Sequence, residues 1–210
     1  SIVQDPEVEP VLRRIAEMTE VVSVRQKKPL GLGHAVLCAR DLVGNEPFAV
    51  MLADDLIDSA TPCIRQLLNI FQCTNESVIA LMEVPQTEVH QYGVIKGKVM
   101  KERLYEVEGM VEKPPAKDAP SRMAIIGRYV LRPEIFSILQ NLPSGKGGEI
   151  QLTDGLAHLL RERKIYGCEF SGDRYDIGDK FGFVRATVAY ALKRADLRDK
   201  VLEYLKSAKY

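Results

Sequence analysis

The stretch Phe48-Ala-Val-Met-Leu-Ala-Asp-Asp55 is a nearly continuous apolar run that ends in two carboxylates. Such a run is typical of a β-strand that is covered on both faces. Residues 61–72 then show the apolar spacing of a helix, with Thr61 as the expected N-cap and Pro62 at the first helical position, and residues 77–84 form a second apolar run. This strand–helix–strand order predicts an α/β fold with a Rossmann-like doubly wound mixed sheet, whose ligands bind where strands end.

The same alternation continues on both sides of this stretch. Toward the N-terminus the sequence predicts a helix at 6–18, a short strand at 21–24 (VVSV) and a helix at 34–43. Toward the C-terminus it predicts a mixed-strand portion at 85–130 with a turn signal at Lys96-Gly97, helices at 132–142 and 153–164, a strand at 164–170 and a helical segment at 182–206. We expect residues 1–210 to form a single domain.

The composition excludes several classes of protein. Lysine plus arginine and aspartate plus glutamate are equal at 29 each, so no net charge attracts nucleic acid or an anionic membrane. Hydrophobic residues make up 46% of the 210 residues, which suits a globular core. No apolar run approaches the ~20 residues that span a bilayer, and residues 1–10 lack the pattern of a signal peptide. We therefore expect a cytoplasmic protein that binds neither nucleic acid nor membranes.

The cysteines and histidines give no sign of a metal or redox centre. The four cysteines form no CxxC pair and are expected to be reduced structural thiols, and the three histidines are scattered along the chain.

Aspartates end two predicted strands. Asp54 and Asp55 close the apolar run at 48–55, and Asp176 lies in the loop that follows the strand at 164–170. A carboxylate at such a place must be solvated, paired or bound to metal, because burying it alone is costly. A capping or turn role is one explanation. Two strand-end aspartates can also hold one Mg²⁺ together with phosphate oxygens and water.

Two further polar pairs follow predicted strands or loops. Glu112-Lys113 precedes Pro114, where strand pairing must stop. The pair can form a surface salt bridge, or Lys113 can bind a phosphate monoester while Glu112 accepts hydrogen bonds from sugar hydroxyls. Thr153-Asp154 is most simply the N-cap of the helix at 153–164.

The sequence Gly31-Leu-Gly-His-Ala-Val36 resembles a dinucleotide-binding loop only superficially. Val36 occupies the third glycine position, and the loop at 26–30 is too long for the tight first turn of that motif. The glycines can also simply permit a turn and a close helix start.

Seven stretches, taken in order, resemble the motifs of one family, the bacterial UTP–glucose-1-phosphate uridylyltransferases within the wider sugar-nucleotidyltransferases. The likeness covers residues 21–188. Gly31-Leu-Gly-His-Ala-Val36 together with GGEIQLTD at 147–154 resembles the uridylyltransferase branch, whereas thymidylyltransferases usually carry GLAQA-like loops. The stretches are RQKKPLGLGHAVLCA, MLADDLID, YGVI, VEKP, MAIIGRYVL, GGEIQLTD and YDIGDKFGF.

The resemblance implies both an activity and a set of site residues. The implied reaction joins UTP and glucose 1-phosphate, with Mg²⁺ as cofactor, and forms UDP-glucose and pyrophosphate. The implied assembly is a homodimer or homotetramer. The implied residues are Gln26 and Gly31 for uracil, Asp54 and Asp176 for magnesium, Gly93, Glu112 and Ile125 for glucose, and Lys113 for the sugar phosphate. Asp54, Lys113 and Asp176 are the implied catalytic residues, and Asp55 receives no role.

One feature of the family is absent from these 210 residues. Family members begin with a strand and a glycine-rich loop resembling GxGTRxxPxTKxxPKEMLP, and no such loop occurs in the sequence. We therefore expect this chain to lack the first strands and helices of the fold and to be incomplete as an enzyme by itself. Two alternatives remain open: a related nucleotidyltransferase that uses dTTP, and a non-catalytic regulatory paralogue that binds sugar nucleotide.

Overall fold

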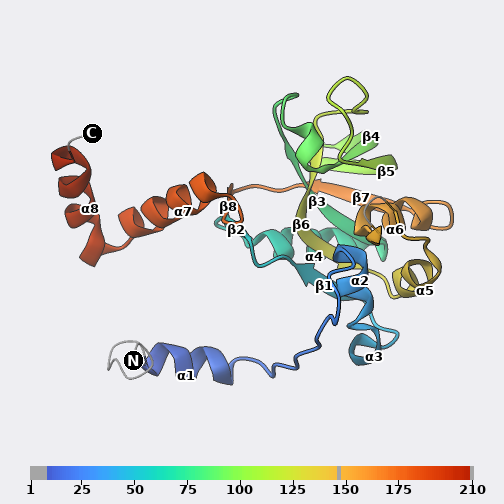
Figure 1. The fold of residues 1–210 in the computed structure, drawn as a ribbon, viewed down its shortest axis with the longest axis horizontal. Coiled ribbons are helices and arrows are strands. Elements are labelled where there is room, and N and C mark those ends of the chain that lie inside the picture. The colour runs from blue at the N-terminus through green and yellow to red at the C-terminus, as the bar shows by residue number, and fades with distance from the viewer. Residues whose placement is uncertain (1–8, 146–147, 209–210) are drawn as a thin grey trace.

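A six-stranded mixed sheet forms the centre of the protein (Figure 1). The structure, a computed structural model, describes residues 9–145 and 148–208. The strand order across the sheet is β1-β6-β3-β7-β5-β4. The strands are β1 Phe48–Met51, β3 Ser77–Glu83, β4 Gly93–Lys101, β5 Leu104–Glu112, β6 Met123–Leu131 and β7 Ile165–Glu169.

Four strands of this sheet run in the same direction. β3 and β7 are parallel neighbours, β6 lies antiparallel between β1 and β3, and β5 lies antiparallel between β7 and β4, so β1, β3, β4 and β7 share one direction. Helix α4 (Cys63–Thr74) connects β1 to β3 by way of the short strand β2. The predicted α/β architecture with a mixed sheet is confirmed, and the carboxyl ends of β1, β3 and β7 lie at one edge of it.

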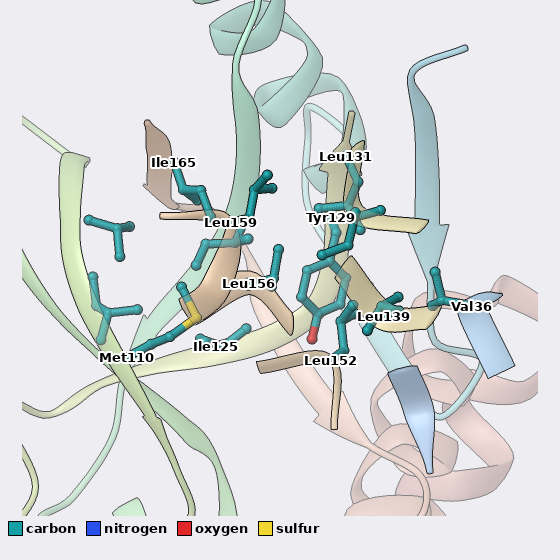
Figure 2. Close-up of a cluster of buried hydrophobic side chains, with 14 of the residues drawn as sticks. Val36, Met110, Ile125, Tyr129, Leu131, Leu139, Leu152, Leu156, Leu159 and Ile165 are labelled. Carbon is teal, nitrogen blue, oxygen red and sulfur yellow. The ribbon is translucent and has the colours of Figure 1, made fainter. Parts of the chain in front are cut away.

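Both faces of the sheet carry a hydrophobic core. Successive side chains of a strand point to opposite faces, and the central strands are therefore apolar almost throughout. Ile79 and Leu81 of β3 join the core under α2 (Leu32–Leu37), α5 (Glu134–Asn141) and α6 (Leu152–Leu159), whereas Val78 and Ala80 join the core under α4. Figure 2 shows the first core, where side chains of the helices surround Tyr129.

The edge strand β1 differs from the sequence prediction. Residues 48–55 were expected to form one strand covered on both faces, but β1 ends at Met51 and its side chains alternate between half-buried and exposed. The aspartates lie beyond this strand. Asp55 instead begins β2 (Asp55–Asp58), which pairs antiparallel with β8 (Asp173–Asp176) in a separate two-stranded ribbon.

The hairpin formed by β4 and β5 also turns at an unexpected place. The predicted turn at Lys96-Gly97 is wrong, because these residues lie within β4 at a shift of register. The chain reverses at residues 102–103, where Arg103 has a φ of 61°. A Cβ at Gly97 would lie 3.0 Å from the Glu106 carbonyl oxygen, which explains the need for glycine in the strand.

The two ends of the described chain extend away from this body (Figure 1). Of the helix predicted at 6–18, the described part is α1 (Glu9–Glu17), and residues 6–8 lie outside the described chain. The strand predicted at 21–24 is wrong: Val21, Val22 and Val24 are exposed and in no sheet. β-Branched residues favour a strand only where a partner strand is available. The remaining elements are α3 (Arg40–Val43), a short 3₁₀ helix (Val89–Gln91), α7 (Lys180–Lys193) and α8 (Ala195–Ser207).

Candidate functional site

A cleft of about 300 Å³ opens at the edge of the sheet where β1 ends. Its walls come from β6, the ends of β4 and β5, the start of α6 and the β2–β8 ribbon. The cleft brings together six of the eight residues that the sequence singled out: Asp54, Gly93, Glu112, Lys113, Ile125 and Asp176.

Asp54 and Asp176 lie side by side although more than a hundred residues separate them in the sequence. The antiparallel pairing of β2 with β8 sets Asp55 opposite Asp176, and the Ile177 N–H donates to the Asp54 carbonyl oxygen at 2.8 Å. A Cβ at Gly178 would lie 3.2 Å from Asp176 Oδ1 and 3.4 Å from Asp54 Oδ2. Glycine therefore keeps open the space that the two carboxylates face.

These two carboxylates have the chemistry of a site for a hard cation. Their oxygens are the ligand type that Mg²⁺ prefers, and a Mg²⁺ site commonly uses only one or two carboxylates plus phosphate oxygens and water. In the described chain no group of three or more histidine, cysteine, aspartate or glutamate side chains forms a metal site. Asp54 and Asp176 could thus hold a cation only together with ligands from water or a bound phosphate.

Asp55 is a buried structural carboxylate. Only 5% of its surface is exposed, and its Oδ2 accepts a hydrogen bond from the Gly127 N–H at 2.9 Å. Its Oδ1 forms an ion pair with Arg174 Nε. Asp55 therefore joins the ribbon to β6, a role that the sequence did not suggest.

Arg174 is the main site residue that the sequence analysis missed. Its side chain is 10% exposed and contacts Asp55, Asp176 and the hydroxyl of Tyr92. Burial alone would lower the pKa of Arg174, but the charge and hydrogen bond of Asp55, together with Tyr92, raise that pKa above its ordinary value. The sequence carried no clear signal for it, because Asp55 and Asp176 become neighbours of Arg174 only through the pairing of β2 with β8.

Gly93 lies where three side chains of the cleft wall pack closely together. A Cβ there would lie 2.8 Å from Thr153 Oγ1 and 3.2 Å from both a Glu112 carboxylate oxygen and a methyl of Ile125. Thr153 was predicted to cap a helix, and this is wrong: α6 starts at Leu152 with Gln151 at the N-cap position. Thr153 is instead buried and lines the cleft.

Lys113 directly follows β5 and has an uncommon backbone conformation. Its φ is 45°, in the left-handed region that residues with a side chain rarely adopt, and its N–H donates to the Tyr92 carbonyl oxygen at 2.9 Å. Its Nζ lies 3.6 Å from Glu112 Oε1. Such conformations cluster at functional sites, where the surrounding structure compensates for their cost.

Gln26 and Gly31 are not among the residues that line this cleft. Gln26 Nε2 lies 3.1 Å from the Gly31 carbonyl oxygen and 2.9 Å from His34 Nδ1. Gly31 has a φ of 91°, and a Cβ there would lie 2.7 Å from the Ile150 carbonyl oxygen. The two residues thus belong to a loop that packs against the segment before α6, beside Leu32 at the cleft wall.

The cysteines form no disulfide among the described residues. Cys38, Cys63, Cys73 and Cys168 are all free. Among the described residues, no helix is long and apolar enough to span a membrane.

The mixed sheet and a cleft lined by carboxylates define a class of α/β protein that binds its ligands where strands end. The chain belongs to the Nucleotidyl transferase family, whose profile matches residues 3–193.

Two similar relatives within that family carry the same name. The chain is 46% identical over 190 residues to the UTP–glucose-1-phosphate uridylyltransferase of Staphylococcus haemolyticus. The aligned residues cover 90% of this chain and 66% of the relative. It is 43% identical over 194 residues to the uridylyltransferase of the same name from Bacillus subtilis, covering 92% of this chain and 66% of the relative. The chain thus spans about two thirds of the length of these relatives, and the resemblance found in the sequence is confirmed.

Solved structures of the same kind share the fold. A crystal structure of UDP-glucose pyrophosphorylase in complex with UDP-glucose matches with a TM-score of 0.87 at 43% identity, covering 92% of this chain and 74% of that one. A UTP-bound UGPase from Acinetobacter baumannii matches with a TM-score of 0.84 at 32% identity, covering 99% of this chain and 74% of that one.

Proposed function

We propose that this chain contributes the sugar site, the metal ligands and part of the uracil site of an enzyme that makes UDP-glucose and pyrophosphate from UTP and glucose 1-phosphate. The observation that carries the proposal is the convergence of Asp54 and Asp176 with the Glu112-Lys113 pair in one cleft. The names of the relatives and the bound ligands of the similar structures support it.

Asp54 and Asp176 would hold one Mg²⁺. Their adjacent oxygens face one open space beside Gly178 and fit a cation that completes its coordination with phosphate and water oxygens. When bound, the cation would offset negative charge on the reacting phosphates.

The other residues of the cleft would bind the sugar phosphate. The Lys113 ammonium is a compact charge suited to the phosphate of glucose 1-phosphate, and Glu112 can accept hydrogen bonds from the glucose hydroxyls. The absence of a side chain at Gly93 lets Glu112 and Ile125 approach closely in the cleft wall, where Ile125 would offer the sugar an apolar contact. Gln26 and Gly31, on the neighbouring loop, would contact the uracil.

The chemistry requires alignment more than covalent participation by the protein. A phosphate oxygen of glucose 1-phosphate attacks the α-phosphorus of UTP, a new P–O bond forms, and the bond from the α-phosphorus to the oxygen of the leaving pyrophosphate breaks. By fixing the sugar phosphate, Lys113 would orient the attacking oxygen in line with the leaving group.

We also propose that the complete protein is a cytoplasmic homodimer or homotetramer, with the C-terminal helical segment at 182–206 as part of the interface. α7 and α8 extend from the body and carry exposed apolar side chains, which favours a role in assembly. Light scattering of the complete protein tests this proposal, because a monomer at micromolar concentration would contradict it.

The function is tested by following pyrophosphate release from UTP, glucose 1-phosphate and Mg²⁺ with the complete protein. We expect turnover with UTP and little with dTTP. Equal turnover of both nucleotides would assign a different base specificity, and sugar-nucleotide binding without any turnover would identify a non-catalytic paralogue.

A further inference from the structure

Arg174 uses all three of its guanidinium nitrogens within the cleft wall. Nε pairs with Asp55 Oδ1, Nη2 donates to Asp176 Oδ2 at 2.9 Å, and Nη1 donates to the Tyr92 hydroxyl at 3.1 Å. The guanidinium carbon also lies 5.4 Å from the centre of the Tyr92 ring. Because all three nitrogens of the planar guanidinium are bonded and the side chain is nearly buried, the Arg174 guanidinium is held in one orientation.

This arrangement divides the two oxygens of Asp176 between different tasks. Oδ2 accepts from Arg174, whereas Oδ1 accepts from the Gly178 N–H at 3.1 Å and is the oxygen near Gly178 that shares the open space with Asp54 Oδ2. Oδ1 also accepts from the Asp179 N–H at 3.3 Å, so Arg174 on one oxygen and two backbone N–H groups on the other together fix the rotation of the carboxylate. By contrast, no side chain of the described chain bonds to the Asp54 carboxylate.

Arg174 also balances charge at this place. Three carboxylates, those of Asp54, Asp55 and Asp176, lie around the start of the ribbon, and Asp55 is buried. Asp55 holds the guanidinium through an ion pair in which both side chains are at most 10% exposed. Carboxylates that bind metals are commonly oriented in this way by a second hydrogen-bonded group.

We propose that Arg174 is a positioning residue that, anchored by Asp55 and Tyr92, orients Asp176 for binding a divalent cation with Asp54. This inference rests on the metal assignment made under the proposed function. Asp55 and Tyr92 contribute to the positioning of Asp176 indirectly, because they hold the Arg174 guanidinium in place.

The test compares Arg174→Gln with Arg174→Lys in the complete protein. Mn²⁺ binding in the presence of UDP-glucose is measured by electron paramagnetic resonance, together with the Mg²⁺ concentration that gives half-maximal turnover. Removal of such an orienting group typically weakens metal binding about 10- to 100-fold, and we expect this range for Arg174→Gln. Lysine keeps the charge but cannot bond two carboxylates as a fork, so Arg174→Lys should show a smaller loss.

A matched control lies at the opposite edge of the sheet. Arg163 pairs with both oxygens of Glu76 at 2.9 Å, just before β7 and β3 begin and outside the cleft lining, so Arg163→Gln also removes an arginine–carboxylate pair. We expect this variant to lower the melting temperature without changing Mn²⁺ affinity.

The outcomes separate the inference from the proposed function. If the wild type binds Mn²⁺ but makes no UDP-glucose, the proposed function fails and the positioning role still stands or falls on the Mn²⁺ affinities of the variants. If a folded Arg174→Gln or Arg174→Lys variant binds Mn²⁺ as tightly as the wild type, the positioning role is wrong. The positioning role is also wrong if Arg163→Gln weakens Mn²⁺ binding as much as Arg174→Gln does. If Arg174→Gln does not fold, the Mn²⁺ affinity of Arg174→Lys alone tests the role.

Discussion

At each of the two ends of the parallel strands of the central sheet, an arginine lies between two carboxylates, but the surroundings differ. Below, the edge where these strands begin and the edge where they end refer to these two ends. At the edge where β3 and β7 begin, Arg163 contacts Glu76 and Glu134 and is 32% exposed. At the edge where β1, β3 and β7 end, Arg174 contacts Asp55 and Asp176 and is 10% exposed. Similar groups therefore occur in a half-buried cluster and in one whose arginine and one of whose carboxylates, Asp55, are nearly buried.

The difference lies in which oxygens stay available. At the first edge Arg163 occupies both oxygens of Glu76, which suits a cluster that only joins neighbouring elements. At the second edge Arg174 takes one oxygen of Asp176 and leaves the other facing Asp54. Ion pairing by itself thus does not identify a site; the difference is that Asp176 and Asp54 line the same cleft.

The largest difference between the edges should appear on removing Asp55. Asp55→Ala leaves the buried Arg174 without its main partner and the Gly127 N–H without an acceptor, so we expect a loss of about 3–5 kcal/mol in the free energy of unfolding. Glu76→Ala, in the half-buried pair with Arg163, should cost less, because water can reach the arginine that remains. Urea unfolding followed by circular dichroism measures both, and equal losses would show that burial does not distinguish the two clusters.

Next in size is the effect of Asp54→Asn and Asp176→Asn on catalysis. Each change removes one anionic ligand and preserves shape, and we expect turnover to fall on the order of 100-fold at saturating Mg²⁺. Glu134→Gln at the other edge should leave turnover unchanged. Steady-state kinetics with circular dichroism as a check on folding decides the matter, and wild-type rates for either asparagine variant would remove the metal assignment.

Lys113→Ala should have a selective effect on one substrate. Losing a charge-assisted contact to the sugar phosphate should weaken glucose 1-phosphate binding roughly tenfold to a hundredfold, and UTP binding much less. Lys164→Ala serves as the control, because Lys164 pairs with Glu106 near the start of β7. Separate titration of the two substrates gives the answer, and an equal loss for both contradicts the role of Lys113.

The smallest effect distinguishes the two ends of α4. Burial raises the pKa of the Cys63 thiol to about 12, whereas Cys73 near the other end is exposed. Burial also raises the pKa of Cys168 to about 11. Since the thiolate is the reactive form, iodoacetamide at about pH 8 should label Cys73 well before either buried thiol. Peptide mapping by mass spectrometry follows the order, and early labelling of Cys63 would show that this end of α4 opens readily.

The sequence predicted the fold and much of the cleft because both depend on strand ends. Apolar runs place the strands, and the segments that follow β1 and β7 lie close enough for β2 and β8 to pair, which brings Asp54 and Asp176 together. The fold class and the family were confirmed by the structure and the relatives, whereas the individual ligand roles remain predictions.

What the sequence could not give depends on tertiary context. Valines at 21–24 suit a strand, but no described strand pairs with them. Thr153 looks like a helix cap, yet the first turn of α6 directs it into the cleft. Arg174 looks like a solvent-exposed arginine in a polar loop, and only the pairing of β2 with β8 reveals that it is nearly enclosed by Asp55, Asp176 and Tyr92.

The pairing of β2 with β8 also has a consequence for the order of folding. Asp55 and Arg174 are separated by 119 positions, and most of the sheet is formed by residues between them. Contacts between such distant positions form slowly, because the loop must close before they contribute any stability. We therefore expect the ribbon to assemble late in refolding, after the β4–β5 hairpin and the β3–β6 pair. A chain caught before that step would have most of its native secondary structure and still be unable to bind a cation.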